Sequence, residues 1–179
     1  MPMKTRILGG LLAAVVLAGS ALAAEKAREL PYAAGNPSGG VPLWNPGEQF
    51  VAVSGGACLG TCPVYDLYVF SDGRVIFSGR KYTGKLGVMT KQISPDTYAS
   101  LLTLIVRTDV LDKKLKRGSC LSDHPMLTVM RSTTDGQRVR VRDLNSGCAG
   151  HADLARDIET RFLEDTEVQN WLVPGKNSR

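Results

Sequence analysis

The sequence predicts an α+β fold, in which an antiparallel β-sheet built from hairpins carries two α-helices on one face. Two stretches with apolar residues at every second position each surround an Asp-Gly pair, at Asp72-Gly73 and Asp135-Gly136, and this pattern is typical of β-hairpins. A segment with helical periodicity follows each hairpin. The order hairpin, helix, hairpin, helix therefore favours an antiparallel sheet with both helices on one face.

The first 23 residues have the layout of a signal peptide. Lys4 and Arg6 precede an uncharged apolar run over residues 7–23, and Ala21-Leu22-Ala23 supplies the small residues of a cleavage site before Ala24. The run is interrupted by glycines and is shorter than the roughly 20 apolar residues of a spanning helix. We therefore expect export to the periplasm or the outside of the cell, with no retained membrane anchor.

The remaining chain divides into three parts. Residues 24–47 are rich in Pro and Gly and are expected to form an extended or disordered arm, whose end Leu43 and Trp44 attach to the domain. Residues 48–173 form one α+β domain, and residues 174–179 form a tail. Loss of Lys4 and Arg6 lowers the net charge from +5 to +3, an ordinary value for a soluble domain, so no nucleic-acid partner is expected.

The first hairpin has a specific predicted register. A strand near residues 50–53 precedes it, and a three-residue loop, Ser71–Gly73, places Val69 opposite Val75 and Leu67 opposite Phe77. Tyr65 then shares the face of these four residues. A further strand is expected around residues 88–93.

Two helices follow from local signals. Ser94 is a capping residue before Pro95 at the first helical position, and the apolar residues Tyr98, Leu101, Leu102 and Ile105 recur on one side. The second helix is expected at about residues 152–163, with an apolar side formed by Leu154, Ala155, Ile158 and Phe162.

The second hairpin is predicted with a three-residue loop, Thr134–Gly136, by analogy with the first. This loop places Leu127, Val129, Val139 and Val141 on one face and turns Arg138, Arg140 and Arg142 outward. The arginines then form either a solvated face or a surface for an anionic envelope component.

The four cysteines, Cys58, Cys62, Cys120 and Cys148, are expected to form disulfides in an exported chain. Cys120 and Cys148 flank the second hairpin at nearly equal distances from its turn, which favours their pairing and leaves Cys58 and Cys62 as a local clip. On the chain-entropy model the longer bridge stabilises the fold by roughly 3–4 kcal/mol, and the clip by less.

The motif G-x-C-x-G-x-C-P-x-Y followed by an Asp-Gly hairpin resembles the bacterial family DUF6438, a domain of unknown function. It is carried by Gly56, Cys58, Gly60, Cys62, Pro63, Tyr65, Asp72 and Gly73. The resemblance extends over roughly residues 49–171 and implies a fold unit of exported bacterial proteins. It implies no reaction.

Two chemical alternatives involve Cys58 and Cys62. Thiol–disulfide exchange usually uses a C-x-x-C motif at the start of a helix, whereas this spacing is C-x-x-x-C and a strand follows. A zinc site could combine Cys58, Cys62, Cys148 and His151, but an oxidising compartment disfavours free thiolates.

Motifs of hydrolases and nucleotide-binding proteins are absent from the sequence, which contains neither G-x-S-x-G, H-E-x-x-H nor a P-loop. We therefore expect a non-catalytic envelope domain without a cofactor, acting as a binding or structural module held by two disulfides. Its expected partner is an anionic envelope component or another envelope protein.

Overall fold

The computed structural model describes residues 28–31, 43–115, 120–121 and 123–173. The predicted signal peptide and the predicted tail at residues 174–179 lie outside the described residues. In chain order, the elements are β1 (Arg28–Pro31), β2 (Phe50–Gly55), β3 (Val64–Phe70), β4 (Arg74–Lys81), β5 (Gly87–Gln92), α1 (Pro95–Thr108), β6 (Met126–Ser132), β7 (Arg138–Asn145), α2 (Ala152–Asp165) and α3 (Gln169–Leu172).

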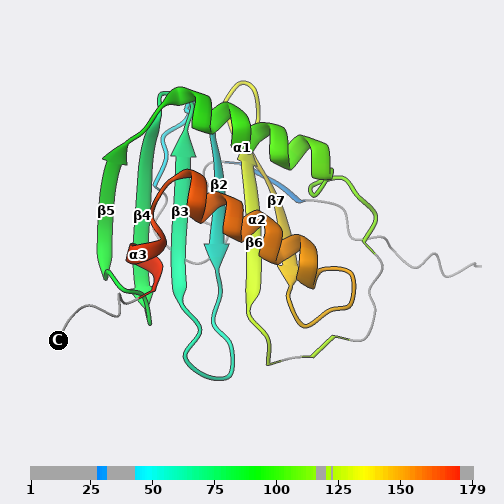
Figure 1. The fold of residues 1–179 in the computed structure, drawn as a ribbon. Helices are drawn as coiled ribbons and strands as arrows, with labels where there is room; N and C mark the ends of the chain where they lie inside the picture. Colours follow the sequence, from blue (N-terminus) through cyan, green and yellow to red (C-terminus); the bar gives the residue numbers. More distant parts are fainter. Residues whose placement is uncertain (1–27, 32–42, 116–119, 122, 174–179) are drawn as a thin grey trace, which may run out of the picture.

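The described strands form one antiparallel sheet in the order β1-β7-β6-β2-β3-β4-β5. Both long helices, α1 and α2, contact each other and cross the same face of this sheet (Figure 1). The predicted α+β class and the placement of two helices on one face are therefore confirmed. The short helix α3 had no clear signal in the sequence.

The main core lies between the sheet and the two long helices. The sheet contributes apolar residues from its five inner strands, among them Val53, Leu67, Phe77, Val129 and Leu144. The helices contribute Leu101, Ile105, Ala155, Ile158 and Phe162, all buried. Removing these side chains from water is the main contribution that holds the helices on the sheet.

A second core covers part of the opposite face of the sheet. Trp44 lies over Phe50 and Tyr68, with ring centroids 5.2 and 5.9 Å away. Phe70 and Met130 are buried in the same cluster. Because both faces of the sheet are covered here, all six residues of the central strand β2 are buried. No face of this strand is in contact with water, and its sequence therefore shows no alternation of polar and apolar residues.

The first hairpin has the predicted register. Leu67 pairs with Phe77 and Val69 with Val75. Gly73, the last residue of the three-residue loop, has φ +83°, a conformation that glycine adopts without steric cost. The predicted apolar face formed by Tyr65 and these four residues lies in the main core.

The second hairpin differs from the prediction by one residue. Val129 lies opposite Arg142, and Met130 lies opposite Val141. Val129 therefore faces the helices, whereas Val139 and Val141 belong to the core on the other face. The prediction that the four apolar residues of this hairpin share one face was wrong. Of the three arginines predicted to point outward, Arg138 is exposed, whereas Arg142 is buried.

The physical reason is a longer turn. The backbone N–H of Thr133 donates to the carbonyl of Arg138 at 2.8 Å, so the loop holds four residues, Thr134–Gln137, rather than three. The Asp135 carboxylate closes this loop by accepting from the Thr133 hydroxyl and the Gln137 N–H. A change of one residue in register moves every side chain to the opposite face.

The sheet and its cores extend into the predicted arm. β1 pairs with β7 at one edge of the sheet, and Trp44 is 3 % exposed. The prediction that Leu43 and Trp44 attach the arm to the domain is confirmed, because both pack in the second core.

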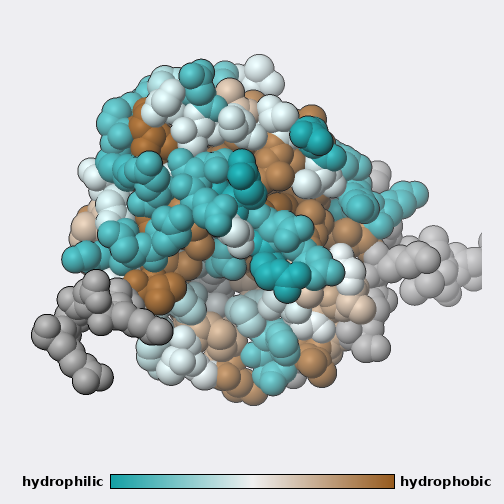
Figure 2. All heavy atoms as spheres, in the orientation of Figure 1, coloured by the Kyte–Doolittle hydropathy of each residue, from teal (hydrophilic) through white to brown (hydrophobic). Residues whose placement is uncertain are grey.

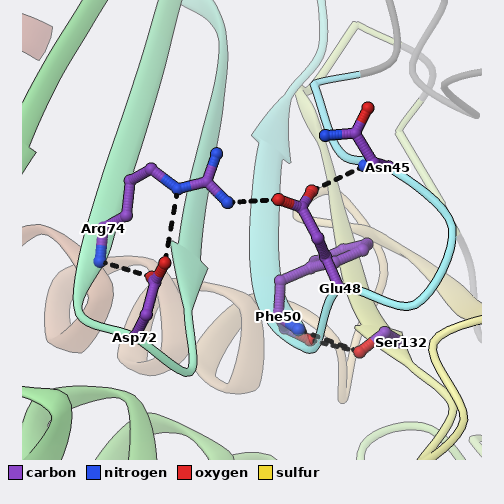
Figure 3. A network of polar contacts seen from close by, with 6 residues as sticks. All are labelled: Asn45, Glu48, Phe50, Asp72, Arg74 and Ser132. Carbon is purple, nitrogen blue, oxygen red and sulfur yellow. Dashed lines mark hydrogen bonds and ion pairs between the residues drawn. The ribbon is translucent and has the colours of Figure 1, made fainter.

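A polar network fixes the chain between Trp44 and β2 (Figure 3). Glu48 accepts from the Asn45 N–H at 2.6 Å and pairs with the Arg74 guanidinium. The Ser132 hydroxyl accepts from the Phe50 N–H at 2.8 Å. These contacts connect the segment before β2 to the turn between β3 and β4 and to the end of β6.

The predicted cap of the first helix is confirmed. The Ser94 side chain accepts from the Asp96 N–H, and Pro95 occupies the start of α1. Asp109, with φ +53°, ends the helix in the left-handed conformation. α1 and α2 are amphipathic, and the sides buried against the sheet include Leu101 and Phe162.

Candidate functional site

Both disulfides lie in loops at the same end of the strands. Cys58 and Cys62 are bonded within the connection from β2 to β3, with Cα atoms 5.7 Å apart. Cys120, before β6, is bonded to Cys148, after β7. The predicted pairing is therefore confirmed. We call the three loops at this end, residues 56–63, 120–121 with 123–126, and 145–151, the disulfide edge; it lies at the lower end of the sheet in Figure 1.

Backbone hydrogen bonds join the three loops. The Gly56 N–H donates to the carbonyl of Met126 at 2.7 Å, and the Leu59 N–H donates to the carbonyl of Asp123 at 3.3 Å. Leu121 donates in the same way to Gly147 at 3.1 Å. With two covalent bridges and these contacts, the loops form a unit that loses little further conformational freedom when a ligand binds.

A small cleft separates the disulfide edge from α2. Its walls are formed on the loop side by Gly55, Cys62, Pro63, Pro125 and Met126, and on the helix side by Ala152, Ala155, Arg156 and Glu159. The space-filling view shows the helix-bearing face hollowed below α2 (Figure 2). Its volume of about 170 Å³ is below the roughly 300–1,000 Å³ of sites for drug-sized ligands. The cleft therefore suits one side chain better than a cofactor.

The motif tyrosine connects the sheet to α2 beside this cleft. The Tyr65 hydroxyl donates to the Glu159 carboxylate at 2.5 Å. Burial, followed by the charge of Glu159, raises the pKa of Tyr65 well above its usual value. The phenol thus remains protonated at neutral pH and serves as a hydrogen-bond donor.

Glycine is required next to this tyrosine. A Cβ atom at Gly55 would lie 2.4 Å from Cε1 of the Tyr65 ring, so a larger residue would displace the ring. Gly60, in the clip loop, has φ +138°, a conformation that L-residues other than glycine rarely adopt. These glycines shape the backbone around the motif.

The other motif residues have structural surroundings. Pro63 lines the cleft, and the Asp72 carboxylate accepts from the Arg74 N–H at 2.9 Å in the turn after β3. Gly73 packs closely in this turn, because a Cβ there would lie 2.2 Å from the carbonyl oxygen of Ile93.

Three apolar side chains on the loops of the disulfide edge are exposed: Leu59 (82 % exposed), Leu121 (59 %) and Met126 (41 %). Of these, Met126 lines the cleft. None of the predictions from the sequence involved these three residues. Leu59 gave a usable signal, because it is an apolar residue within the short clip loop between two cysteines. Glu159 and Arg156 gave none, because their proximity to the motif depends on where α2 packs.

The two chemical alternatives are not favoured by this geometry. Cys58, Cys62 and Cys148 are all bonded in disulfides, so the zinc set that would combine them with His151 has no thiolate. The clip is followed by the strand β3 and not by a helix, unlike the redox sites that lower a thiol pKa at a helix start. Among the described residues, no group of three or more His, Cys, Asp or Glu side chains is arranged to hold a metal.

A buried carboxylate lies on the opposite face of the sheet. Asp66 is 1 % exposed, accepts from the Ser54 hydroxyl at 2.6 Å and forms an ion pair with Arg80 at 3.3 Å. These two contacts provide the partners that a buried polar group requires.

The predicted arginine stripe lies away from the disulfide edge. Arg142 is 3 % exposed, and its guanidinium donates to the carbonyls of Val110, at 3.2 Å, and Lys113. Arg140 forms an ion pair with Asp112. The anion-binding role of Arg138, Arg140 and Arg142 stays a prediction, although Arg142 is turned into the protein.

None of the described helices is long and apolar enough to cross a membrane. The paired cysteines are typical of a protein outside the cytoplasm.

Comparison with curated proteins and with solved structures gives no match. The family model described as a domain of unknown function, DUF6438, matches residues 49–162, which is more than half of the chain and includes the motif, the clip and most of α2. The chain therefore belongs to the DUF6438 family.

Proposed function

We propose that this chain is an exported, non-catalytic domain of the bacterial envelope that binds an apolar segment of another envelope protein at the disulfide edge. The observation that carries the proposal is that Leu59, Leu121 and Met126 are exposed on loops held by two disulfides, where Met126 also lines a small cleft. Exposed apolar side chains that gather in one place are characteristic of interaction sites.

The shape and chemistry of the cleft support a peptide or protein partner. The cleft accepts one apolar anchor side chain, while Arg156 and Glu159 supply polar groups at its helix side. An apolar centre with a polar rim is the usual anatomy of a protein interface. The prior ordering of the loops reduces the entropy that binding would cost.

A binding role also agrees with the state of the reactive groups near the cleft. The Tyr65 hydroxyl is engaged by Glu159, and all four cysteines are bonded in pairs. The disulfides support a location in the periplasm or outside the cell, and the predicted signal peptide supports the same location.

The proposal can be tested by selecting displayed random peptides on the oxidised chain from residue 24 onward. We expect enriched peptides to share an apolar anchor. Because burying one apolar side chain contributes roughly 1.5–3 kcal/mol, Leu59→Ser or Met126→Ser should weaken their binding by about tenfold or more. The matched control is Val106→Ser, which changes a side chain on α1 that is 57 % exposed.

A second arm replaces Cys58 and Cys62 by serine. Loosening the clip loop should weaken binding while circular dichroism shows the sheet retained. Enriched peptides that bind Met126→Ser as tightly as they bind the unchanged chain, or selection that enriches no apolar anchor, would refute the proposed function.

A further inference from the structure

Two arginines face each other on neighbouring strands at the other end of β6. Arg131 pairs in register with Arg140 of β7. Val129 of β6 faces the helices. Arg131, two residues further along the strand, points to the same face, and so does Arg140, which lies directly opposite it. Like charges directly opposite each other destabilise a sheet unless an anion compensates them.

Two carboxylates, Asp109 and Asp112, line the same cavity as these two cations. Asp112 forms its ion pair with Arg140. The hydrogen bond from Arg140 lowers the pKa of Asp112, partly opposed by burial, and the charges of Arg140, Arg131 and Arg142 lower it further. The side chain of Arg131 makes no hydrogen bond or ion pair with any residue that the structure describes.

The side chain of Arg131 lies between two small cavities under α1. One, of about 120 Å³, is lined by Asp109, Asp112 and Arg140 among others, and the second, of about 170 Å³, is lined by Tyr98 and Thr133 among others. Arg131 lines both cavities. The guanidinium thus has space beside it, whereas that of Arg142 is used by backbone carbonyls.

The residues around the second cavity include further hydrogen-bonding groups. The Tyr98 hydroxyl is half-buried; burial raises its pKa, and the charge of Arg131 opposes this rise, which places the two groups near each other. Thr133 and Thr134 complete the polar side of this cavity. A phenol that remains protonated can donate to an anion bound by the guanidinium.

We propose that Arg131 is the centre of an oxyanion site that binds a single carboxylate or phosphate group between α1 and the β6–β7 hairpin. The planar guanidinium offers a pair of parallel N–H donors that match either group. Tyr98 and Arg140 flank the bound group from the two cavities. This site lies at the opposite end of β6 from the disulfide edge, so it goes beyond the proposed function and does not depend on it.

The site also differs from the arginine stripe predicted from the sequence. Arg131 was not part of that stripe, and the structure brings it next to Arg140 through the register of the second hairpin.

The test is an NMR titration of the arginine side-chain N–H signals in the full chain from residue 24 onward. Inorganic phosphate and acetate are the two probes, each at constant ionic strength adjusted with chloride. We expect a saturable shift of the Arg131 signal with at least one probe, and the tighter probe identifies the source of the oxyanion. Arg131→Gln should weaken binding by at least tenfold, whereas the control Arg161→Gln, which removes an exposed arginine paired with Asp165, should not.

Thermal unfolding separates a binding role from a structural one. Without a probe, Arg131→Gln should raise Tm at low salt, because it removes the repulsion between two facing arginines, and phosphate or acetate should then give no further increase. A lower Tm for Arg131→Gln without a probe would show that the guanidinium stabilises the fold, and would overturn the proposal. Shifts that grow linearly with both probes, without saturation, would also overturn it, and this result comes from the unchanged chain even if the variant fails to fold.

Discussion

The Tyr65 hydroxyl lies 2.5 Å from a carboxylate oxygen of Glu159, across 94 residues of sequence. This contact joins β3, which carries the family motif, to the middle of α2. The aromatic ring of Tyr65 also stacks on Phe77 of β4, with centroids 5.7 Å apart. The motif tyrosine therefore fixes the position of the helix that forms one wall of the cleft.

Tyr65→Phe should reduce the free energy of unfolding by about 1–2 kcal/mol, because it leaves a half-buried carboxylate without its donor. Urea unfolding measures this loss. In a double-mutant cycle with Glu159→Gln, we expect a coupling of at least 0.5 kcal/mol, the lower bound for residues in direct contact. Additive losses would mean that the two side chains do not interact in solution.

Alkaline pH should destabilise the fold through its buried tyrosines. Burial raises the pKa of Tyr65 and of Tyr68 well above the usual value near 10. The pKa of each tyrosine is higher in the folded protein than in the unfolded chain. The free energy of unfolding is therefore unaffected by their ionisation below pH 10 and falls as pH rises further. Each such tyrosine should add a slope of about 1.4 kcal/mol per pH unit above pH 10.

Unfolding by urea at several pH values between neutral and strongly alkaline measures that slope. Tyr65→Phe should flatten it, and Tyr82→Phe, at a residue that is 44 % exposed, serves as the control. An equal slope in Tyr65→Phe and the unchanged chain would contradict the assignment.

The two disulfides should contribute unequally to stability. The chain-entropy model gives roughly 3–4 kcal/mol for Cys120–Cys148, with a separation of 28 residues, and about 2 kcal/mol for Cys58–Cys62, with a separation of 4. Thermal unfolding of the two double serine variants should therefore rank the Cys120/Cys148 variant lower. Peptide mapping without reductant checks the pairing directly, and a Cys58–Cys148 crosslink would contradict it.

The sequence was sufficient for the first hairpin and the cysteine pairs because their signals are local. Ser71-Asp72-Gly73 supplies a turn of known geometry, and Cys120 and Cys148 flank a single hairpin. The second hairpin was mispredicted because its arginines resemble a solvated strand face. In the structure, Arg140 pairs with Asp112, and Arg142 donates to the carbonyls of Val110 and Lys113. No local sequence pattern indicates that the connection after α1, which contains these residues, packs against β7.

The same limit applies to the candidate site. The motif residues Cys62, Pro63 and Tyr65 were identified from the sequence, and they form one wall of the cleft or its immediate support. The opposite wall comes from α2, whose amphipathic pattern indicates that it is buried on one side but not which strand it covers. Met126, at the start of β6, gave no signal either, because its position opposite α2 depends on where that helix packs.

Substitution of two glycines should separate steric conflict from backbone strain. Gly136 and Gly87 both have positive φ, +66° and +85°. A Cβ at Gly136 would lie 2.4 Å from the backbone of Gly47, whereas a Cβ at Gly87 meets nothing within 4 Å. Gly87→Ala should cost roughly 1–2 kcal/mol from the left-handed conformation alone, and Gly136→Ala clearly more. Equal losses in Tm would show that the Gly47 segment moves away without cost.

The segment before residue 48 should be required for stability, although it precedes both the predicted domain and the family match. Trp44 is almost completely buried over Phe50 and Tyr68, so its loss opens the second core to water. Trp44→Ala should reduce the free energy of unfolding by roughly 3–5 kcal/mol. A chain that begins at residue 48 should lose at least as much, because it also lacks the pairing of β1 with β7.

The matched control is Leu59→Ala, which removes an apolar side chain that is 82 % exposed and should change stability by no more than about 0.5 kcal/mol. If Trp44→Ala and the shortened chain unfold at the same temperature as the unchanged protein, the second core does not contribute to the fold, and the domain begins at β2.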